Sequence, residues 1–405
     1  MKGVRVSLLI VFLVSLSGGY LLSPEKKVDE SLYLREVAPE TEFLPKKGAY
    51  YPSEEGVIAF NTYDITPEIK GYAGPIKFLI ALGPDGKIRG IRLLEHKETP
   101  NYVHRMETPG FLSQFLGKGV NDPFLVDRDI DGISRATVSV EALAKTVRES
   151  SKKAGRDMGL AVIGKDGGSA APHIGGAAAY LGLFAFALTG YFITRKSKRQ
   201  LRLRDISLLL SIAVLGLWLS APFSILHVFN LLLGRSSADP LLYALIASTA
   251  LSIIAAGRFY CGWLCPFGAI SEVAGRLPIR KWQVAYETDD RWRNAKYLLF
   301  GAAVAVVFLT RKTGFGNFET YVTLFSRSGN ALTWSLVGVS LILSLRVERF
   351  WCRYLCPVAA LTGALSRKTK GYPSRHDCPM ANKPDPSISE CIRCNRCYLS
   401  PPPLR

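Results

Sequence analysis

Two stretches of the sequence share one pattern, 258-RFYCGWLCPFGAI-270 and 349-RFWCRYLCPVAAL-361. They are offset by 91 residues, and each follows an apolar segment, which indicates an internal repeat. In both copies two cysteines stand four residues apart, and the proline after the second cysteine disfavours a helix there. The repeat therefore predicts two pseudo-symmetric halves whose cysteine pairs come together at the membrane edge.

The eight cysteines of the chain fall into two sets of four, and four thiolates are what one iron–sulfur cluster requires. The first set belongs to the repeats, and we predict that it holds one cluster between the two halves. Two pairs of reduced, structural cysteines are the alternative, and zinc is another metal that cysteine binds. This set consists of Cys261, Cys265, Cys352 and Cys356.

The second set lies in the C-terminal tail, SRHDCPMANKPDPSISECIRCNRCYLSPPPLR. Three of its cysteines have the Cys-x2-Cys-x2-Cys spacing of a bacterial ferredoxin loop, which wraps thiolates around one corner of a cubane. A more distant cysteine, also followed by proline, can supply the fourth thiolate. We therefore predict a [4Fe–4S] cluster in the tail, with a zinc knuckle as the alternative. Its ligands are Cys378, Cys391, Cys394 and Cys397.

Composition and charge place most of the chain in a membrane. The hydrophobic fraction is 48% and the mean hydropathy is +0.15. Residues 24–172 hold 21 Lys+Arg and 22 Asp+Glu, so the net charge of +18 arises in the rest, which holds 30 basic and 11 acidic residues. Basic loops between apolar segments follow the positive-inside rule, whereas nucleic-acid binding needs a basic face on a folded soluble domain. We therefore expect no nucleic-acid partner.

Six apolar segments predict six transmembrane helices with both termini in the cytoplasm. The first, Val6 to Leu22, follows a basic start and is either a cleaved signal peptide or, as we favour, an anchor. The basic run 195–204 marks the loop after the second segment as cytoplasmic, and alternation from there places both sets of cysteines inside. The other five segments cover about residues 175–194, 206–223, 240–257, 295–310 and 331–347.

The segment 24–172 is predicted to be an exported α+β domain without cysteine. Alternating apolar residues over 76–96 indicate two strands joined by the turn Gly83-Pro84-Asp85-Gly86. The stretch after Thr137 has the periodicity of an amphipathic helix. The expected domains are an anchor at 1–23, the exported domain at 24–172, a transmembrane domain at 173–370 and a cytoplasmic tail at 371–405.

Between the predicted hairpin and the predicted helix lies D-G-I-S-R-A-T, residues 131–137. It resembles the D-G-x-S/T-G-A-T flavinylation motif of RnfG/NqrC-type FMN-binding domains, and the hairpin with its following H-x-E-T-P segment is similar to the same family. In that family a flavin transferase joins the FMN phosphate to the last threonine hydroxyl, which implies Thr137 here. The resemblance also implies flavin contacts at Asp131, Gly132, Ser134, Arg135, Ala136, Glu98 and Thr99.

One residue departs from that motif, because Arg135 stands where the family has glycine. Glycine is normally used where the backbone must approach a ligand closely. Arginine either pairs with the FMN phosphate or blocks the attachment, and the sequence leaves both alternatives open. Ser139 is a weaker alternative acceptor.

Together, the FMN motif, the doubled C-x3-C-P motif and the cysteine-rich tail resemble the NosR/NirI/PceC family of membrane flavo-iron–sulfur proteins, and the membrane half is similar to NapH. The resemblance implies a multi-domain cytoplasmic-membrane protein with an exported α+β FMN-binding domain, a six-helix transmembrane bundle and a cytoplasmic ferredoxin-like tail.

The same resemblance implies electron transfer between the cytoplasmic clusters, or the quinone pool, and covalent FMN on the outer side. The expected partners are redox subunits or an exported reductase, a flavin transferase and quinone. We expect an electron-transfer component of a respiratory system rather than a stand-alone enzyme. A membrane redox sensor, or an assembly factor for a respiratory enzyme, is the alternative.

Overall fold

The computed structural model divides the chain into two compact units, which are described separately. The helical unit comprises Met1–Pro24, His173–Phe229 and Pro240–Arg405, and the sheet unit comprises Glu25–Pro172 and Asn230–Asp239. The structure describes residues 2–22, 29–69, 75–96, 109–126, 128–132, 137–162, 174–194, 197, 199–234, 239–282, 284–311, 318–327, 329–366, 378, 380 and 390–396.

The sheet unit is built on four antiparallel strands in the order β1-β2-β3-β4. The strands are β1 (Tyr50–Pro52), β2 (Ile58–Asn61), β3 (Ile76–Leu82) and β4 (Ile88–His96). Strands β3 and β4 form a hairpin in which Ile80 lies opposite Ile91. The N–H of Gly83 donates to the carbonyl of Lys87 at 2.9 Å, and Gly86 has a φ of +74°, which glycine adopts without strain. The hairpin and turn expected from the sequence are therefore confirmed.

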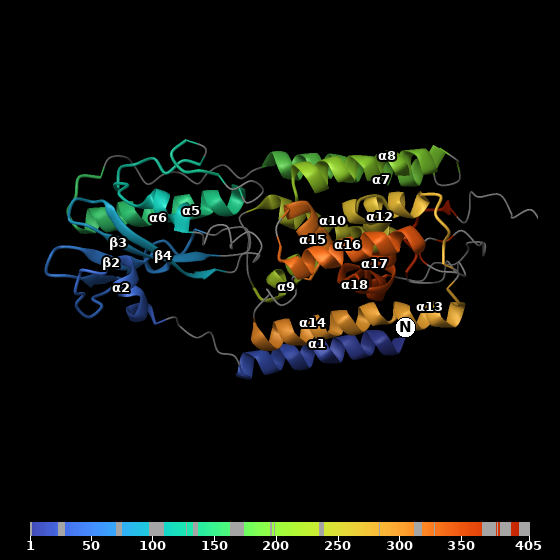
Figure 1. The fold of residues 1–405 in the computed structure, drawn as a ribbon, viewed down its shortest axis with the longest axis horizontal. Helices are drawn as coiled ribbons and strands as arrows, with labels where there is room; N and C mark the ends of the chain where they lie inside the picture. Colours follow the sequence, from blue (N-terminus) through green and yellow to red (C-terminus); the bar gives the residue numbers. More distant parts are fainter. Residues whose placement is uncertain are drawn as a thin grey trace, which may run out of the picture. The chain divides into compact units, whose positions relative to one another are not determined.

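Helices cover both faces of this sheet (Figure 1). The helical elements are η1 (Glu30–Tyr33), α2 (Leu34–Val37), α3 (Thr62–Ile65), α5 (Pro109–Leu112), η2 (Ser113–Phe115) and α6 (Thr137–Asp157). On one face Val140 and Val147 of α6 pack in a core with Phe78 of β3. On the other face Val37 of α2 packs with Leu79. The predicted amphipathic helix after Thr137 is therefore confirmed, and its apolar stripe closes the main core of the unit.

All elements described from residue 174 onward are helices, and the helix α1 (Lys2–Leu22) belongs to the same unit as most of them. The elements are α7 (Ile174–Ile193), α8 (Arg199–Ser211), the π-helix η3 (Ile212–Trp218), α9 (Ile225–Leu232), α10 (Pro240–Ala256), α11 (Phe259–Trp263), α12 (Pro266–Arg276), α13 (Tyr286–Arg293), α14 (Ala295–Thr310), α15 (Thr320–Ser326), α16 (Ala331–Arg346), α17 (Phe350–Tyr354) and α18 (Pro357–Leu365).

The structure describes fewer helices of membrane-spanning length than the six that the sequence predicted. Among the described residues, two are long and apolar enough, Ile174–Ile193 and Glu287–Thr310. The pair α15 and α16, bent by 106°, would make a third if it forms one span. Val6–Gly19 and Pro240–Ala256 are apolar but shorter. The predicted span 206–223 differs most, since its helix begins at Arg199, changes to a π-helix at Ile212 and ends at Trp218.

Helix α1 lies along α14 (Figure 1). The rings of Phe12 and Phe308 meet edge to face with centroids 5.0 Å apart. Gly19 lies so close to α14 that a β-carbon on it would come within 1.9 Å of the Phe308 carbonyl oxygen. Gly19 therefore serves the close packing of α1 against α14.

Candidate functional site

The two C-x3-C-P repeats have the same local structure. In each, a five-residue helix, α11 or α17, ends two residues before the second cysteine. That cysteine caps the next helix, and the proline takes the first helical position, where its missing N–H costs nothing. The sulfur atoms of Cys265 and Cys356 accept hydrogen bonds from the N–H groups of Gly268 and Ala359, both at 3.4 Å. Proline thus breaks the helix as predicted, but it starts a new helix at once.

The structure brings the cysteines of the two repeats into one buried region of the helical unit. The sulfur of Cys261 lies 3.8 Å from the hydroxyl of Thr362 in α18, and the carbonyl of Cys261 accepts a hydrogen bond from Arg349 Nη1 at 2.6 Å. Burial raises the pKa of the Cys265 thiol, and the nearby Cys352 and Cys261 raise it further. None of these cysteines forms a disulfide.

No three His, Cys, Asp or Glu side chains within the described ranges converge closely enough to hold a single metal ion. The donor set of the repeats is instead four buried or half-buried thiols, two within the short helices α11 and α17 and two at the N-caps of α12 and α18. Thiolates are the donors that iron–sulfur clusters use.

Positive charge is in excess inside the helical unit. Among its described residues, seven cationic side chains but only four carboxylates are buried. Uncompensated buried charge is unfavourable unless a counter-charge is present, and thiolates that hold a cluster would supply it. The cationic residues are Arg204, Arg258, Arg293, Lys296, Arg349, Arg353 and Arg393, and the carboxylates belong to Glu272, Asp289, Glu319 and Glu390.

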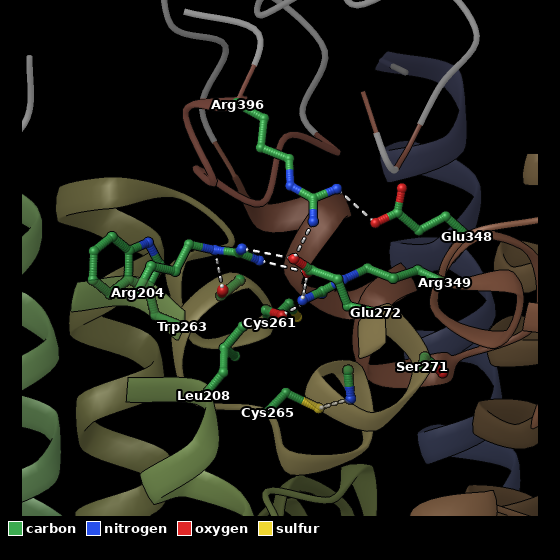
Figure 2. Close-up of polar contacts among 12 residues, drawn as sticks. Arg204, Leu208, Cys261, Trp263, Cys265, Ser271, Glu272, Glu348, Arg349 and Arg396 are labelled. Carbon is green, nitrogen blue, oxygen red and sulfur yellow. Dashed lines mark hydrogen bonds and ion pairs between the residues drawn. The ribbon is translucent and has the colours of Figure 1, made fainter. Parts of the chain in front are cut away.

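One carboxylate organises much of this charge, that of Glu272 in α12 (Figure 2). Arg204 binds it through two parallel hydrogen bonds of 2.8 and 2.6 Å, and Arg349 Nε donates to it at 2.9 Å. Arg276 and Arg396 reach the other side of the same group at 2.7 and 2.8 Å. Burial opposes ionisation, but the charges of Arg349 and Arg204 outweigh it and hold the pKa of Glu272 far below its usual range.

The tail segment 390–396 is docked on the first repeat. Gly262 has no room for a side chain, since a β-carbon there would lie 1.9 Å from the carbonyl oxygen of Ile392. Trp263 Nε1 donates to the carbonyl of Arg393 at 3.2 Å. Arg396 bridges Glu272 and Glu348, at 2.8 and 2.7 Å, so it spans both repeats (Figure 2).

Because the segment 390–396 is docked in this way, part of the predicted tail site lies beside the repeats. Cys394 is buried and Cys391 is half-buried, and the two are close enough to interact electrostatically. Arg204 and Glu272 also act on the Cys394 thiol, which places that residue beside the Glu272 network. Cys378 is described only as a half-buried residue, and Cys397 lies outside the described residues.

The predicted flavin motif is described only at its two ends. The N–H of Asp131 donates to Gln114 Oε1 at 2.6 Å, and Gly132 follows it as an exposed residue. Thr137 is the first residue of the 21-residue helix α6. The predicted contacts Ser134, Arg135, Ala136, Glu98 and Thr99 lie outside the described residues.

Sequence reasoning missed the charged partners of the thiols. A signal for two of them was present, because Arg258 and Arg349 occupy the same position of the repeat, three residues before the first cysteine. Glu272 has no such signal, since the second repeat has Gly363 at the equivalent position. Its role emerges only when the two repeats and the tail are packed together.

Two family models match the chain. The model of the FMN-binding domain matches residues 71–152, and that of a 4Fe-4S binding domain matches 240–284 and 331–373. Each of the latter segments contains one C-x3-C-P motif. The matches define the class: one polypeptide that combines an FMN-binding domain with a 4Fe-4S binding domain.

Named relatives narrow the class. The chain is 32% identical to Protein NirI of Paracoccus denitrificans over 47% of this chain and 30% of the relative. It is 30% identical to Regulatory protein NosR of Pseudomonas aeruginosa over 42% of this chain and 26% of the relative. The G component of the ion-translocating oxidoreductase complex of Haemophilus influenzae is 27% identical over 31% of this chain and 66% of the relative.

The chain is therefore a NosR/NirI-like FMN and iron–sulfur protein. Its matches span less than a third of the length of NirI and NosR. No solved structure matches it.

Proposed function

We propose that this protein carries electrons through the cytoplasmic membrane, between iron–sulfur clusters on the cytoplasmic side, or the quinone pool, and covalently bound FMN outside. The observation that carries the proposal is the surplus of buried cations around the repeat thiols, with the tail docked on the same site. Such a site is built for groups of net negative charge. Iron–sulfur clusters bound there would supply one-electron transfer.

Two thiolate sets serve this function. Cys261, Cys265, Cys352 and Cys356 would hold one cluster between the repeats, and Cys378, Cys391, Cys394 and Cys397 a [4Fe–4S] cluster in the tail. The repeat site fits such a group because Arg258 is buried there with two N–H donors that lack acceptors among the described residues. The docked segment brings Cys394 close to Arg204, one of the arginines that bind Glu272. The contribution of the chain is to hold both sets in one rigid, positively charged frame.

The topology that we propose keeps the repeats and the tail in the cytoplasm and the segment 24–172 outside. Helix α7 and the span Glu287–Thr310 would cross the bilayer, together with the bent pair α15–α16, α1, the shorter α10 and the continuous helix that runs from α8 into η3. Partners of the exported side would be redox subunits or an exported reductase, with a flavin transferase that attaches FMN.

The electron path has a direct test in inverted membrane vesicles, in which the cytoplasmic face is exposed. A membrane-impermeant reductant added outside should reduce the enclosed FMN at least about tenfold faster in the wild type than in Cys394→Ser, because serine cannot replace the thiolate of the tail set. FMN absorbance follows the reaction, and peptide analysis confirms that both proteins carry flavin. Equal rates would refute the conduit.

Reduced clusters that never pass electrons to FMN, combined with a redox-dependent change in partner binding, would favour the alternative function, a redox sensor or assembly factor. One relative is named Regulatory protein NosR, which supports that alternative, whereas another is named a putative electron transport protein, YccM of Escherichia coli.

Covalent FMN is proposed at Thr137. The first residue of a helix offers exposed N–H groups that favour a phosphate, and the FMN-binding family model covers this position. In protein made together with a flavin transferase, Thr137→Val should lose the flavin adduct, because valine keeps the shape but removes the hydroxyl. Ser139→Ala is the matched control and should keep the adduct.

Mass spectrometry of the tryptic peptide 136–145, which contains both hydroxyl residues, provides the measurement. An adduct that survives in Thr137→Val would disprove the assignment. Arg135→Gly restores the glycine of the motif, and an adduct found only in that variant would mean that Arg135 blocks attachment.

A further inference from the structure

The two repeats place an arginine at the same point, but in the part of the chain that the structure describes only one of these arginines lies within ion-pair distance of a carboxylate. Arg258 and Arg349 are both fully buried, with 1% and 0% exposure, and each precedes the first cysteine of its repeat by three residues. Arg349 crosses to the other repeat, where it pairs with Glu272 at 2.7 Å and donates to the carbonyl of Cys261 at 2.6 Å. Arg349 therefore has a carboxylate partner within the protein, although Arg204 shares it.

The repeat offset of 91 residues places Gly363 of α18 where Glu272 stands in α12. A β-carbon on Gly363 would lie 4.0 Å from Cδ of Arg258 and 2.8 Å from the hydroxyl of Tyr297. The side chain of Arg258 therefore reaches the other repeat as that of Arg349 does. The residue that it meets there is Gly363, which has no carboxylate to offer.

The tail compensates for this asymmetry only in part. Arg258 Nη1 donates to the main-chain carbonyl of Glu390 at 3.0 Å. The carboxylate of Glu390 is bound by Lys296 at 2.7 Å and by Tyr297 at 3.0 Å. Nε and Nη2 of Arg258 have no hydrogen-bond partner in the part of the chain that the structure describes.

A buried guanidinium with two unused N–H donors is unfavourable unless an acceptor completes it. The charge of Arg258 acts on Cys261 and Cys356, one thiol from each repeat, and also on the Glu390 carboxylate, which Lys296 and Tyr297 already bind. A negatively charged acceptor beside the two thiols would complete Arg258.

We propose that Arg258 is a positioning residue of the repeat site, which donates from Nε and Nη2 to the sulfur atoms of the cluster held there and raises its reduction potential. The inference rests on the proposed second cluster. Reduction adds one electron and thus one negative charge, and both a nearby cation and hydrogen bonds to sulfur stabilise the reduced form. The charge of Arg349 also acts on Cys352 and Cys265, but its guanidinium already pairs with Glu272.

The test is an EPR-monitored redox titration of the purified full-length protein. Arg258→Gln removes the charge, and it should make the potential of the repeat cluster more negative by at least a tenfold change in its reduction equilibrium, 59 mV for a one-electron couple. Arg258→Lys keeps the charge and should recover most of the shift. Arg280→Gln removes a charge from an exposed position of the same unit and should leave the potential unchanged.

A second variant keeps the test decisive if Arg258→Gln does not fold. Gly363→Glu supplies the carboxylate that the second repeat lacks, and it is made together with Tyr297→Phe because a β-carbon at position 363 would otherwise lie 2.8 Å from that hydroxyl. Relative to Tyr297→Phe alone, the double variant should have a lower potential, because the carboxylate neutralises Arg258 in place. An unchanged potential of the repeat cluster in a variant with full iron content would overturn the role of Arg258. A structure in which Nε and Nη2 of Arg258 donate only to buried water would overturn it as well. A wild-type protein with iron only in the tail would instead refute the second cluster and this inference with it.

Discussion

Replacing Glu272 by glutamine is expected to destabilise the helical unit by about 3–5 kcal/mol and to release the tail. Glu272 is 1% exposed and accepts from Arg204, Arg349, Arg276 and Arg396 at 2.6 to 2.9 Å. Glutamine has the same shape but no charge, so the buried guanidinium groups of Arg204 and Arg349 would lose their counter-ion. Breaking one side of a buried ion network is costly because the remaining charges stay buried.

Thermal unfolding of the detergent-solubilised protein, with limited proteolysis of the tail, measures both effects. Glu348→Gln is the matched control: it is 24% exposed at the side chain, binds the same Arg396, and should cost no more than about 1 kcal/mol. A Glu272→Gln protein that melts with the wild type and keeps its tail protected would contradict the role of this network.

The pH dependence follows from the lowered pKa of Glu272. A carboxylate whose pKa falls on folding adds stability above its unfolded pKa, about 4.3, and loses it only as the pH falls through the folded pKa. The wild type should therefore keep this contribution at about pH 5, whereas Glu272→Gln lacks it at every pH.

Serine in place of one cysteine of each set should remove one iron–sulfur signal and leave the other. Cys352→Ser should lose the repeat cluster and about half of the bound iron, because a hydroxyl is a much poorer iron ligand than a thiolate. Cys394→Ser should lose the tail cluster instead. Both side chains are buried, so the near-isosteric change isolates the chemistry of the sulfur.

EPR spectra with iron and sulfide analysis of the purified variants provide the measurement. Loss of both signals in either variant would mean that the repeats and the tail share one cluster rather than holding two. Full iron content and unchanged spectra in Cys352→Ser would instead support reduced, structural cysteines at the repeats.

The features that sequence reasoning predicted correctly are local. Gly83 to Gly86 form the expected turn, and the amphipathic helix begins at Thr137 as expected. The proline after Cys265 ends one helix, as predicted. Each of these depends on residues within a few positions of one another, where backbone preference and apolar periodicity decide the outcome.

The membrane segments were harder to predict because the mean hydropathy of an apolar segment does not show whether the charged residues beside it are buried in the fold. Arg204 precedes the apolar segment 206–223, where it reads as the end of a cytoplasmic loop. In the structure it lies within α8, wholly buried, and the helix that follows changes to a π-helix at Ile212. The carboxylate that makes this burial tolerable, Glu272, is 68 residues away.

The sequence by itself determined which thiols this protein offers, how they are spaced, and where helices break around them, since these properties follow from neighbouring residues. Only the tertiary structure decided which charges face the thiols. Arg396 meets Glu272 across 124 residues, and Gly363 leaves Arg258 without the partner that Arg349 has. The physical reason is that a charge becomes decisive only once it is buried, and burial depends on which distant segments pack against it.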